Sequence, residues 1–181
     1  MADTYKLEYQ PLADTNIQVA KKLLETIFPP VWKYAFNEYK NVLAGSPSRP
    51  FVVYLNGEAI GVTGLYELPD YPADIWLMYF GILPKVRGKG LGKQILLTTI
   101  EMAKQMNKKT FRLWTYSEWN KTAQPLYKKY MHLCEPYTNP DDNQYDIENG
   151  KPMVYSYNLE NTSAPEPWAN KFLNVAAEDG R

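Results

Sequence analysis

The chain has 181 residues, of which 45% are apolar, and its 20 basic side chains balance its 20 acidic ones. This length and composition predict one domain with a substantial core, and the zero net charge argues against nucleic acid or an anionic membrane as a partner. A single cysteine, Cys134, excludes an internal disulfide, and a single histidine argues against a structural zinc site. No apolar run reaches membrane-spanning length and the N-terminal residues lack a basic-then-apolar signal, so we expect a cytoplasmic protein.

The first third of the chain predicts a strand, two helices and a hairpin. Residues 5–12 alternate loosely, as in a strand, and apolar residues at helical spacing follow over residues 17–27 until Pro29 and Pro30 end the helix. A second helix is expected over residues 31–43. The Asn56-Gly57 pair between two apolar runs predicts a type I′ hairpin turn.

The remaining elements alternate between strands and helices. We expect strands over residues 74–83, 111–116 and 153–159. An amphipathic helix is expected from Leu91 to Met106, and a shorter helix from about Asn120 to Tyr130. This alternation indicates the α/β class, with antiparallel strands in front.

A turn with three glycines, residues 88–92, connects the strand over residues 74–83 to the amphipathic helix. Glycine accepts positive φ angles and lets a ligand approach the backbone closely. The first amides of the helix have no intrahelical acceptor and lie at the positive end of the helix dipole. A strand, a glycine turn and a helix in this order predict a phosphate-binding site, to which Arg87, Lys89 and Lys93 add positive charge.

The spacing of this turn distinguishes between kinds of phosphate-binding loop. A Walker A loop requires glycine in place of Arg87 and Ser or Thr in place of Gln94, and a dinucleotide fingerprint that begins at Gly88 requires glycine in place of Lys93. The pattern Arg-x-x-Gly-x-Gly, from Arg87 to Gly92, instead resembles the acyl-CoA pyrophosphate loop of the GNAT superfamily of N-acyltransferases. Taken alone, these six residues fit a flexible loop at the start of a core helix equally well.

A second segment supports the resemblance. The residues from Asn120 to Lys129 read Asn-x-x-Ala-x-x-Leu-Tyr-Lys-Lys, similar to the Asn-x-x-Ala-x-x-Leu-Tyr-Glu-Lys that follows the fifth strand in this family. The resemblance implies a GNAT fold, a mixed and mostly antiparallel central sheet flanked by helices, with splayed fourth and fifth strands. It implies an acyltransferase domain at residues 1–160, followed at 161–181 by a C-terminal tail for which a short helix is one option.

The resemblance also implies acetyl-CoA as the cofactor, whereas the single cysteine and single histidine lead us to expect no metal. The loop would bind the pyrophosphate, the fourth strand would lie beside the pantetheine arm, and Asn120 would contact the pantetheine or acyl region. The cofactor-binding residues implied in this way are Phe80, Gly81, Ile82, Arg87, Gly88, Lys89, Gly90, Leu91, Gly92, Lys93 and Asn120. A strand irregularity is the alternative for Gly81, and a plain N-cap is the alternative for Asn120.

Candidates for proton transfer come from the same resemblance. Tyr127 lies where many relatives carry the tyrosine that protonates the leaving thiolate, and a core tyrosine is the alternative. Trp76 and Thr115 stand where some relatives carry a glutamate base, so neither supplies one. Asp74, on the same strand face as Trp76, and Glu67 are the nearest carboxylates. Both could instead be surface groups, and water-relayed removal of the amine proton competes with them.

The resulting hypothesis is an acetyl-CoA-dependent N-acetyltransferase that acts on a small-molecule primary amine by direct transfer. Aromatic residues are candidates for binding the acceptor amine or for the core: Phe28, Trp32, Tyr34, Trp76, Trp114 and Tyr116. A protein or peptide N-acetyltransferase and a non-catalytic acyl-CoA-binding sensor are the alternatives. The acceptor, the acyl length and a homodimer stay open.

Overall fold

The computed structural model describes residues 5–118, 121–138 and 150–171. These residues group into two compact units. The first unit contains 5–66 and 78–99, and the second contains 67–77, 100–118, 121–138 and 150–171. Within the described chain, none of the helices is both long and apolar enough to span a bilayer.

The first unit is built from one hairpin, two flanking strands, two whole helices and residues 91–99 of a third helix, α3 (Leu91–Lys104). Its elements are β1 (Leu7–Pro11), α1 (Ile17–Ile27), α2 (Trp32–Leu43), β2 (Arg49–Leu55), β3 (Glu58–Tyr66) and β5 (Gly81–Ile82). β2 pairs with β1 and β3, and β5 pairs with β3, all antiparallel. Asn56 and Gly57, between β2 and β3, have φ angles of 51° and 80°, which confirms the predicted type I′ turn.

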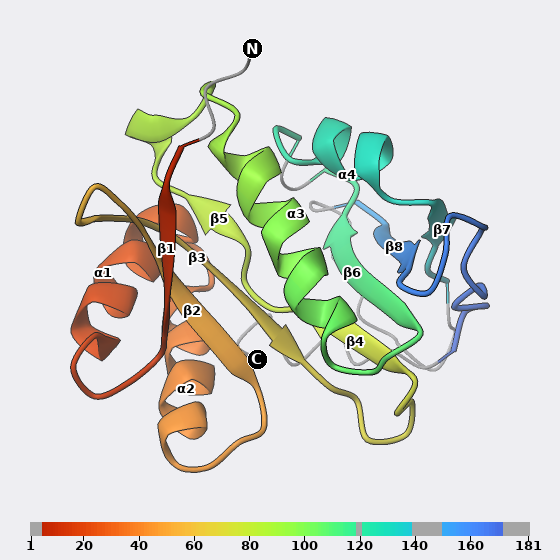
Figure 1. The fold of residues 1–181 in the computed structure, drawn as a ribbon, viewed down its shortest axis with the longest axis horizontal. Helices are drawn as coiled ribbons and strands as arrows, with labels where there is room; N and C mark the ends of the chain where they lie inside the picture. The colour runs from red at the N-terminus through yellow and green to blue at the C-terminus, as the bar shows by residue number, and fades with distance from the viewer. Residues whose placement is uncertain (1–4, 119–120, 139–149, 172–181) are drawn as a thin grey trace. The chain divides into compact units, whose positions relative to one another are not determined.

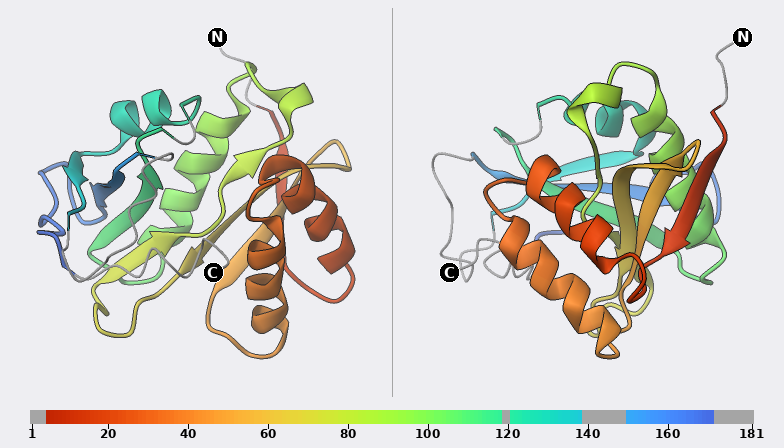
Figure 2. Two further views of the ribbon diagram at one scale, coloured as in Figure 1. Left: turned by 180° about the vertical axis from the view of Figure 1, so that it is seen from behind. Right: turned by 90° about the vertical axis from the view of Figure 1, so that its left-hand side faces the viewer.

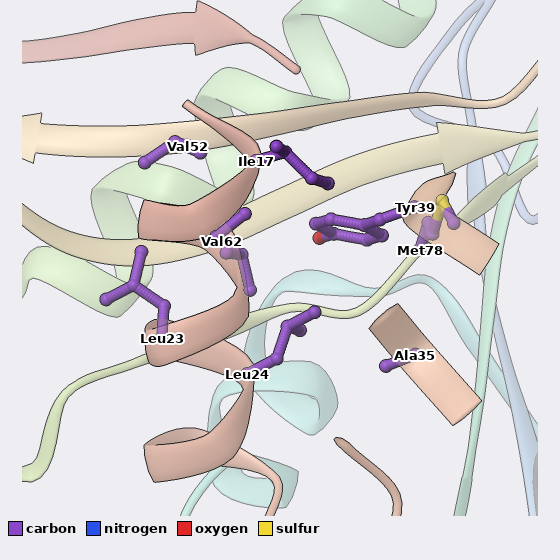
Figure 3. Close-up of a cluster of buried hydrophobic side chains, with 9 residues drawn as sticks. Ile17, Leu23, Leu24, Ala35, Tyr39, Val52, Val62 and Met78 are labelled. Carbon is purple, nitrogen blue, oxygen red and sulfur yellow. The ribbon is translucent and has the colours of Figure 1, made fainter. Parts of the chain in front are cut away.

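Two apolar clusters cover opposite faces of β2 and β3. One cluster joins α1 and α2 to these strands and contains Tyr39, whose ring points from α2 toward α1 (Figure 3). The other joins them to the start of α3 (Leu91–Lys104) through Leu91 and Ile95. Val52 belongs to the first cluster and Val53 to the second, because successive strand side chains point to opposite faces. Figures 1 and 2 show α1 and α2 on one side of the two strands and α3 on the other.

The segment predicted as one strand over residues 74–83 is two short strands. β4 (Asp74–Leu77) ends before Tyr79, and β5 begins at Gly81. Tyr79 has a φ of 32°, in the left-handed region that side chains rarely adopt, so it interrupts the extended backbone. β4 pairs in parallel with β6 (Thr110–Tyr116) only as far as Trp76 and Arg112. The predicted separation of these two strands is therefore confirmed, whereas the prediction of one continuous strand was wrong.

The second unit contains a row of four paired strands in the order β4-β6-β8-β7. Its further elements are α4 (Gln124–Tyr130), β7 (Leu133–Pro136) and β8 (Pro152–Asn158). β6 with β8 and β8 with β7 pair antiparallel, so the predicted mixed and mostly antiparallel strand pairing is confirmed. β8 confirms the last predicted strand. β7 was not predicted, and the helix expected from Asn120 begins only at Gln124, with Pro125 in its first turn.

The register of these four strands assigns their side chains to two faces. Asp74 and Trp76 on β4 share a face with Arg112 on β6, Ser156 on β8 and Glu135 on β7. The C-terminal segment packs against this face, because the indole of Trp168 lies 4.9 Å from that of Trp76, centroid to centroid. The opposite face carries Tyr155, whose ring packs against Tyr127 of α4. None of the described residues of the tail, 161–171, is helical.

Candidate active site

The glycine turn is an exposed loop that leads directly into α3. Residues 87–90 are exposed, and Gly88 and Gly90 have φ angles of 80° and 78°. No atom lies within 4 Å of the place where a Cβ would be on either glycine, so the space beside the backbone is open. α3 begins at Leu91, and its first amides have no acceptor within the helix. This geometry suits an anion held by backbone N–H groups.

Arg87 braces the loop from within. Its guanidinium donates from Nε and Nη2 to the carbonyl oxygen of Ile82, at 3.3 and 3.2 Å. This contact ties the start of the turn to β5. Lys89 is exposed in the turn, and Lys93 follows in the first turn of α3. The loop therefore carries three positively charged side chains. One of them, Arg87, also stabilises the conformation of the loop.

The structure brings β5 and the loop together at Phe80. The ring atom Cζ of Phe80 lies 4.0 Å from the place where a Cβ would be on Gly92, in the first turn of α3. Ile82 is buried, and its strand pairs with Gly61 and Val62 of β3. The predicted cofactor residues 80–82 and 87–93 thus lie in one continuous part of the first unit.

Gly81 is explained by packing. A Cβ at this position would collide with Ile27 Cγ2 and lie 3.0 Å from Phe28 Cζ, both at the end of α1. The glycine therefore lets α1 approach the strand closely. Phe28 also packs edge-on against the ring of Tyr79, at 5.9 Å between centroids, and Tyr79 packs against Tyr39 at 6.1 Å. Contacts with α1 and α2 thus hold Tyr79 in its unusual backbone conformation.

Tyr127 lies in the second unit, where α4 packs on β8. Its side chain is 4% exposed, and its ring lies 5.6 Å from the ring of Tyr155. Burial raises the pKa of the Tyr127 phenol, and the neighbouring Tyr155 raises it further. Tyr155 of β8 lies directly opposite Cys134 of β7 in the strand register. Burial likewise raises the pKa of Tyr155.

Both candidate carboxylates are engaged by cations. Asp74 Oδ2 lies 3.0 Å from Arg112 Nε, and the two side chains are 8% and 2% exposed. The Arg112 Nε–H is not aligned for a hydrogen bond, so the contact is a buried ion pair. Glu67 Oε2 lies 2.6 Å from Lys108 Nζ. Neither carboxylate is presented as a free base, which favours structural roles for both.

The remaining predicted residues belong to both units. Asn120 lies outside the described residues. Trp32 on α2 has the ammonium groups of Lys21 and Lys33 within 5.6 and 5.9 Å of its ring centre. Trp114 and Tyr116 pack edge-on against each other on β6, and Trp76 is fully buried. Of the aromatic residues considered for the acceptor, Phe28, Trp32 and Tyr34 belong to the first unit, and Trp76, Trp114 and Tyr116 belong to the second.

Sequence reasoning missed Arg112 and Tyr79. Arg112 interrupts an apolar strand, and a charged residue at such a position indicates a buried partner. The existence of an ion pair could therefore have been predicted from the sequence. The partner itself and the turn at Tyr79 depend on tertiary contacts. The ring partners of Trp168, which are Tyr71 and Trp76, could not be predicted from a proline-flanked tail.

Comparison with protein families matches residues 17–133 to the model of the Acetyltransferase (GNAT) family. A search of curated proteins finds no match.

Several solved acetyltransferases share the fold of this chain. A GNAT family acetyltransferase from Elizabethkingia anophelis with acetyl-CoA bound is 18% identical, with a TM-score of 0.64, and the match covers 84% of this chain and 97% of that one. A variant of spermidine N-acetyltransferase from Vibrio cholerae is 15% identical, with a TM-score of 0.67 and coverage of 84% and 94%. A ribosomal-protein-alanine N-acetyltransferase from Escherichia coli is 14% identical, with a TM-score of 0.63 and coverage of 92% and 100%.

The family match covers more than half of the chain, and the glycine loop and the separated strands of the structure agree with it. The chain belongs to the Acetyltransferase (GNAT) family and is an acetyltransferase that uses acetyl-CoA.

Proposed function

We propose that this protein transfers the acetyl group of acetyl-CoA directly to the primary amine of a small molecule. The observation that carries the proposal is the approach of Phe80 to Gly92, which joins the strand end to the open glycine loop. A ligand in which a long pantetheine arm separates a pyrophosphate from a thioester requires such a continuous site.

The residues of the loop fit the phosphates of acetyl-CoA. Gly88 and Gly90 leave room beside the backbone, and the first amides of α3 point their N–H groups out of the helix end. Lys89 and Lys93 supply charge to the phosphates, and Arg87 keeps the turn in place through Ile82. Backbone groups of residues 80–82 would hold the pantetheine arm. When bound, acetyl-CoA supplies the activated acyl group.

Tyr127 is proposed to assist the departure of the leaving sulfur by donating a hydrogen bond to it. A phenol with a raised pKa stays protonated at neutral pH, so it is always ready to donate a hydrogen bond. A thiol titrates near pH 8.5, so complete transfer of the proton from such a phenol is uphill. Tyr127 would therefore act mainly by stabilising the developing negative charge on sulfur, and the thiolate would finally take its proton from solvent.

The acceptor amine must lose a proton, and we propose that water removes it. Asp74 is held by Arg112 and Glu67 by Lys108, and taking up a proton would cost each carboxylate its ion pair. A buried pair that loses the charge of one partner leaves an uncompensated charge behind. This cost disfavours a role of Asp74 as the base.

The choice of a small amine rests on two lines of support. The chain has no net charge that would attract a charged macromolecule, and its fold resembles that of a spermidine N-acetyltransferase. A ribosomal-protein-alanine N-acetyltransferase has a similar fold, so a peptide amine is the second candidate.

An amine panel tests the proposal. Purified protein is incubated with acetyl-CoA and, separately, with polyamines, arylalkyl amines and peptides that carry a free N-terminus. Release of CoA thiol is followed by a thiol reagent, and the product is identified by mass. Cys134 is exposed and is the one thiol of the chain, so it can react with the thiol reagent. The Cys134→Ser variant lacks this thiol and is assayed in parallel, which removes the protein's own contribution to the signal. We expect turnover with a small amine.

The outcomes separate the alternatives. Turnover with peptides alone would assign a protein or peptide acceptor. Binding of acetyl-CoA without thiol release from any amine would favour a non-catalytic sensor. The Tyr127→Phe variant then distinguishes enzymatic transfer from slow chemical acetylation of the amines, because chemical acetylation does not depend on this residue.

A further inference from the structure

The C-terminal segment of residues 165–171, named the strap, packs on one face of the strands of the second unit. Its centre is Trp168, which is 1% exposed although it lies outside every helix and strand. The indole packs edge-on against Trp76 at 4.9 Å and against Tyr71 at 4.6 Å between ring centroids. The guanidinium carbon of Arg112 lies 5.4 Å from the centre of the same ring.

These contacts fall at a particular place in the strand pairing. Trp76 and Arg112 form the last residue pair of β4 and β6, beyond which the two strands separate. Trp168 packs on both members of this pair, so it covers the point at which the pairing ends. Phe80, the first residue proposed to face the cofactor, follows Trp76 by four positions.

The strap also completes the hydrogen bonding of Arg112. The Arg112 side chain is 2% exposed and pairs with Asp74. Its Nη1 donates to Ser156 Oγ at 2.7 Å, and its Nη2 donates to the backbone carbonyl of Glu166 at 3.0 Å. A buried guanidinium requires such acceptors, because each unsatisfied N–H in an apolar surrounding is costly. Without the strap, Arg112 would lose one of these acceptors.

Glu135 also binds the strap. It lies on β7, which is at the opposite end of the strand order from β4. Its two carboxylate oxygens accept hydrogen bonds from the backbone N–H groups of Trp168, at 2.8 Å, and Ala169, at 3.1 Å. The indole N–H of Trp168 donates to the carbonyl of Lys171 at 3.0 Å, which closes the turn. Ala169 and Asn170 have φ angles of 56° and 55°, so the turn is left-handed. Hydrogen bonds to its backbone and to its indole N–H, together with the ring contacts, therefore determine the position of Trp168.

We propose that the strap positions the end of β4 for acetyl transfer, with Trp168 as the positioning residue and Glu135 as its anchor. Trp168 acts through Trp76 and Arg112, which fix the backbone from which the chain continues to the proposed cofactor residues. The inference rests on the proposed role of residues 80–82. It does not depend on the identity of the acceptor amine.

Two measurements on the whole chain test the proposal. Hydrogen exchange, followed by mass spectrometry of a peptide over residues 74–78, reports on β4 directly and needs no acceptor. Because Trp168→Ala removes the packing on Trp76, we expect exchange there to become about tenfold faster or more. We expect kcat to fall about tenfold or more, while KM for acetyl-CoA changes less than about threefold because the glycine loop is untouched.

Matched variants isolate the effect. Glu166→Ala alters an exposed side chain of the strap and keeps the carbonyl that Arg112 uses, so we expect wild-type exchange and kcat. Trp168→Phe keeps a ring against Trp76 and should recover most of kcat. Glu135→Gln removes one of the two acceptors, so it should speed exchange over residues 74–78 and lower kcat. Combined with Trp168→Ala it should add little, because both changes release the same segment.

A folded Trp168→Ala variant with unchanged kcat, or with unchanged exchange over residues 74–78, overturns the proposal. If Trp168→Ala does not fold, Glu135→Gln decides instead, and unchanged kcat in that variant likewise overturns it. Failure of the proposed function is a separate result, since it appears as absence of turnover by the wild-type protein while the exchange measurement still reports on the strap.

Discussion

Tyr127 is deeply buried, and its hydroxyl is the group proposed to act in acetyl transfer. The Tyr127→Phe change keeps the ring against Tyr155 and removes this hydroxyl. We expect kcat to fall about a hundredfold or more, with little change in KM for acetyl-CoA, because a hydrogen bond to the developing charge on sulfur stabilises the transition state. Since burial raises the pKa of Tyr127, the wild-type rate should show no loss from ionisation of this group up to about pH 10.

Two comparisons by steady-state kinetics check this prediction. Tyr130→Phe removes a hydroxyl from the same helix, three positions later, and should leave kcat near that of the wild type. An acyl donor with a more acidic thiol should reduce the loss in Tyr127→Phe, because that leaving group needs less help. Near-wild-type kcat for Tyr127→Phe, under conditions in which chemistry limits the rate, would remove the residue from the mechanism.

Tyr39 carries a buried hydroxyl of a different kind. Its side chain is 0% exposed within the cluster of α1 and α2, and its hydroxyl has no hydrogen-bond partner among the described residues. Replacing it by phenylalanine removes an unsatisfied polar atom that costs about 1–3 kcal/mol. We expect Tyr39→Phe to raise the melting temperature by about 2–4 °C for each kcal/mol gained.

Calorimetry at neutral pH measures this change, and acetyl-CoA titration gives a second readout. Unchanged affinity in a more stable variant would assign the hydroxyl to the core alone. A less stable Tyr39→Phe variant would contradict the prediction, because it would mean that the hydroxyl has a partner.

At the scale of the element, the glycine loop allows a change of charge without a change of shape. Gly90 has a φ of 78° and open space where a side chain would lie. Asn and Asp are similar in size and tolerate this backbone region better than other side chains. Gly90→Asp should weaken acetyl-CoA binding about tenfold or more through repulsion of the phosphates, whereas Gly90→Asn should lose much less.

Isothermal titration at two salt concentrations separates the effect of charge from that of shape. The difference between Gly90→Asp and Gly90→Asn should shrink at high salt, because salt screens exposed charges. Equal affinities of the two variants at low salt would show that the phosphates lie elsewhere.

The elements that sequence predicted well are those with a strong local signal. Asn56-Gly57 determines its turn by backbone conformation alone, and α3 follows from apolar spacing after a glycine loop. β7 was missed because its four residues are too few to show alternation. The break at Tyr79 was missed because the residues around it favour a strand, and only the contacts with Phe28 and Tyr39 hold the turn.

The candidate site was predictable in its loop and less so in its charged groups. The loop residues 87–92 are adjacent in sequence, so their pattern indicates their common role. Asp74 was considered as a base because of its place on the strand, but its pairing with Arg112 joins residues 38 positions apart. Trp168 reaches Trp76 across 92 positions. Such partners depend on tertiary packing, which no local pattern encodes.

At the scale of the whole molecule, buried tyrosines in both compact units link stability to pH. Tyr39 belongs to the first unit and Tyr127 to the second, and burial raises the pKa of each phenol. In the unfolded chain both ionise near pH 10. Above that pH the unfolded state binds fewer protons than the folded state, so the free energy of unfolding decreases as pH rises.

We therefore expect stability to fall steeply above about pH 10, by up to about 1.4 kcal/mol per pH unit for each such tyrosine. Urea unfolding at several values between about pH 8 and pH 11 measures this slope on both sides of the phenol pKa. Tyr39→Phe removes one of these groups, so the stability advantage of this variant over the wild type should grow with pH above about 10. Parallel curves for the two proteins would contradict the prediction, because they would mean that the Tyr39 phenol ionises at the same pH in the folded and unfolded states.

Monitoring the two units separately by hydrogen exchange adds a sharper criterion. If the units unfold independently, the gain in stability of Tyr39→Phe should be confined to amides of the first unit, whereas cooperative unfolding would spread this gain over both units.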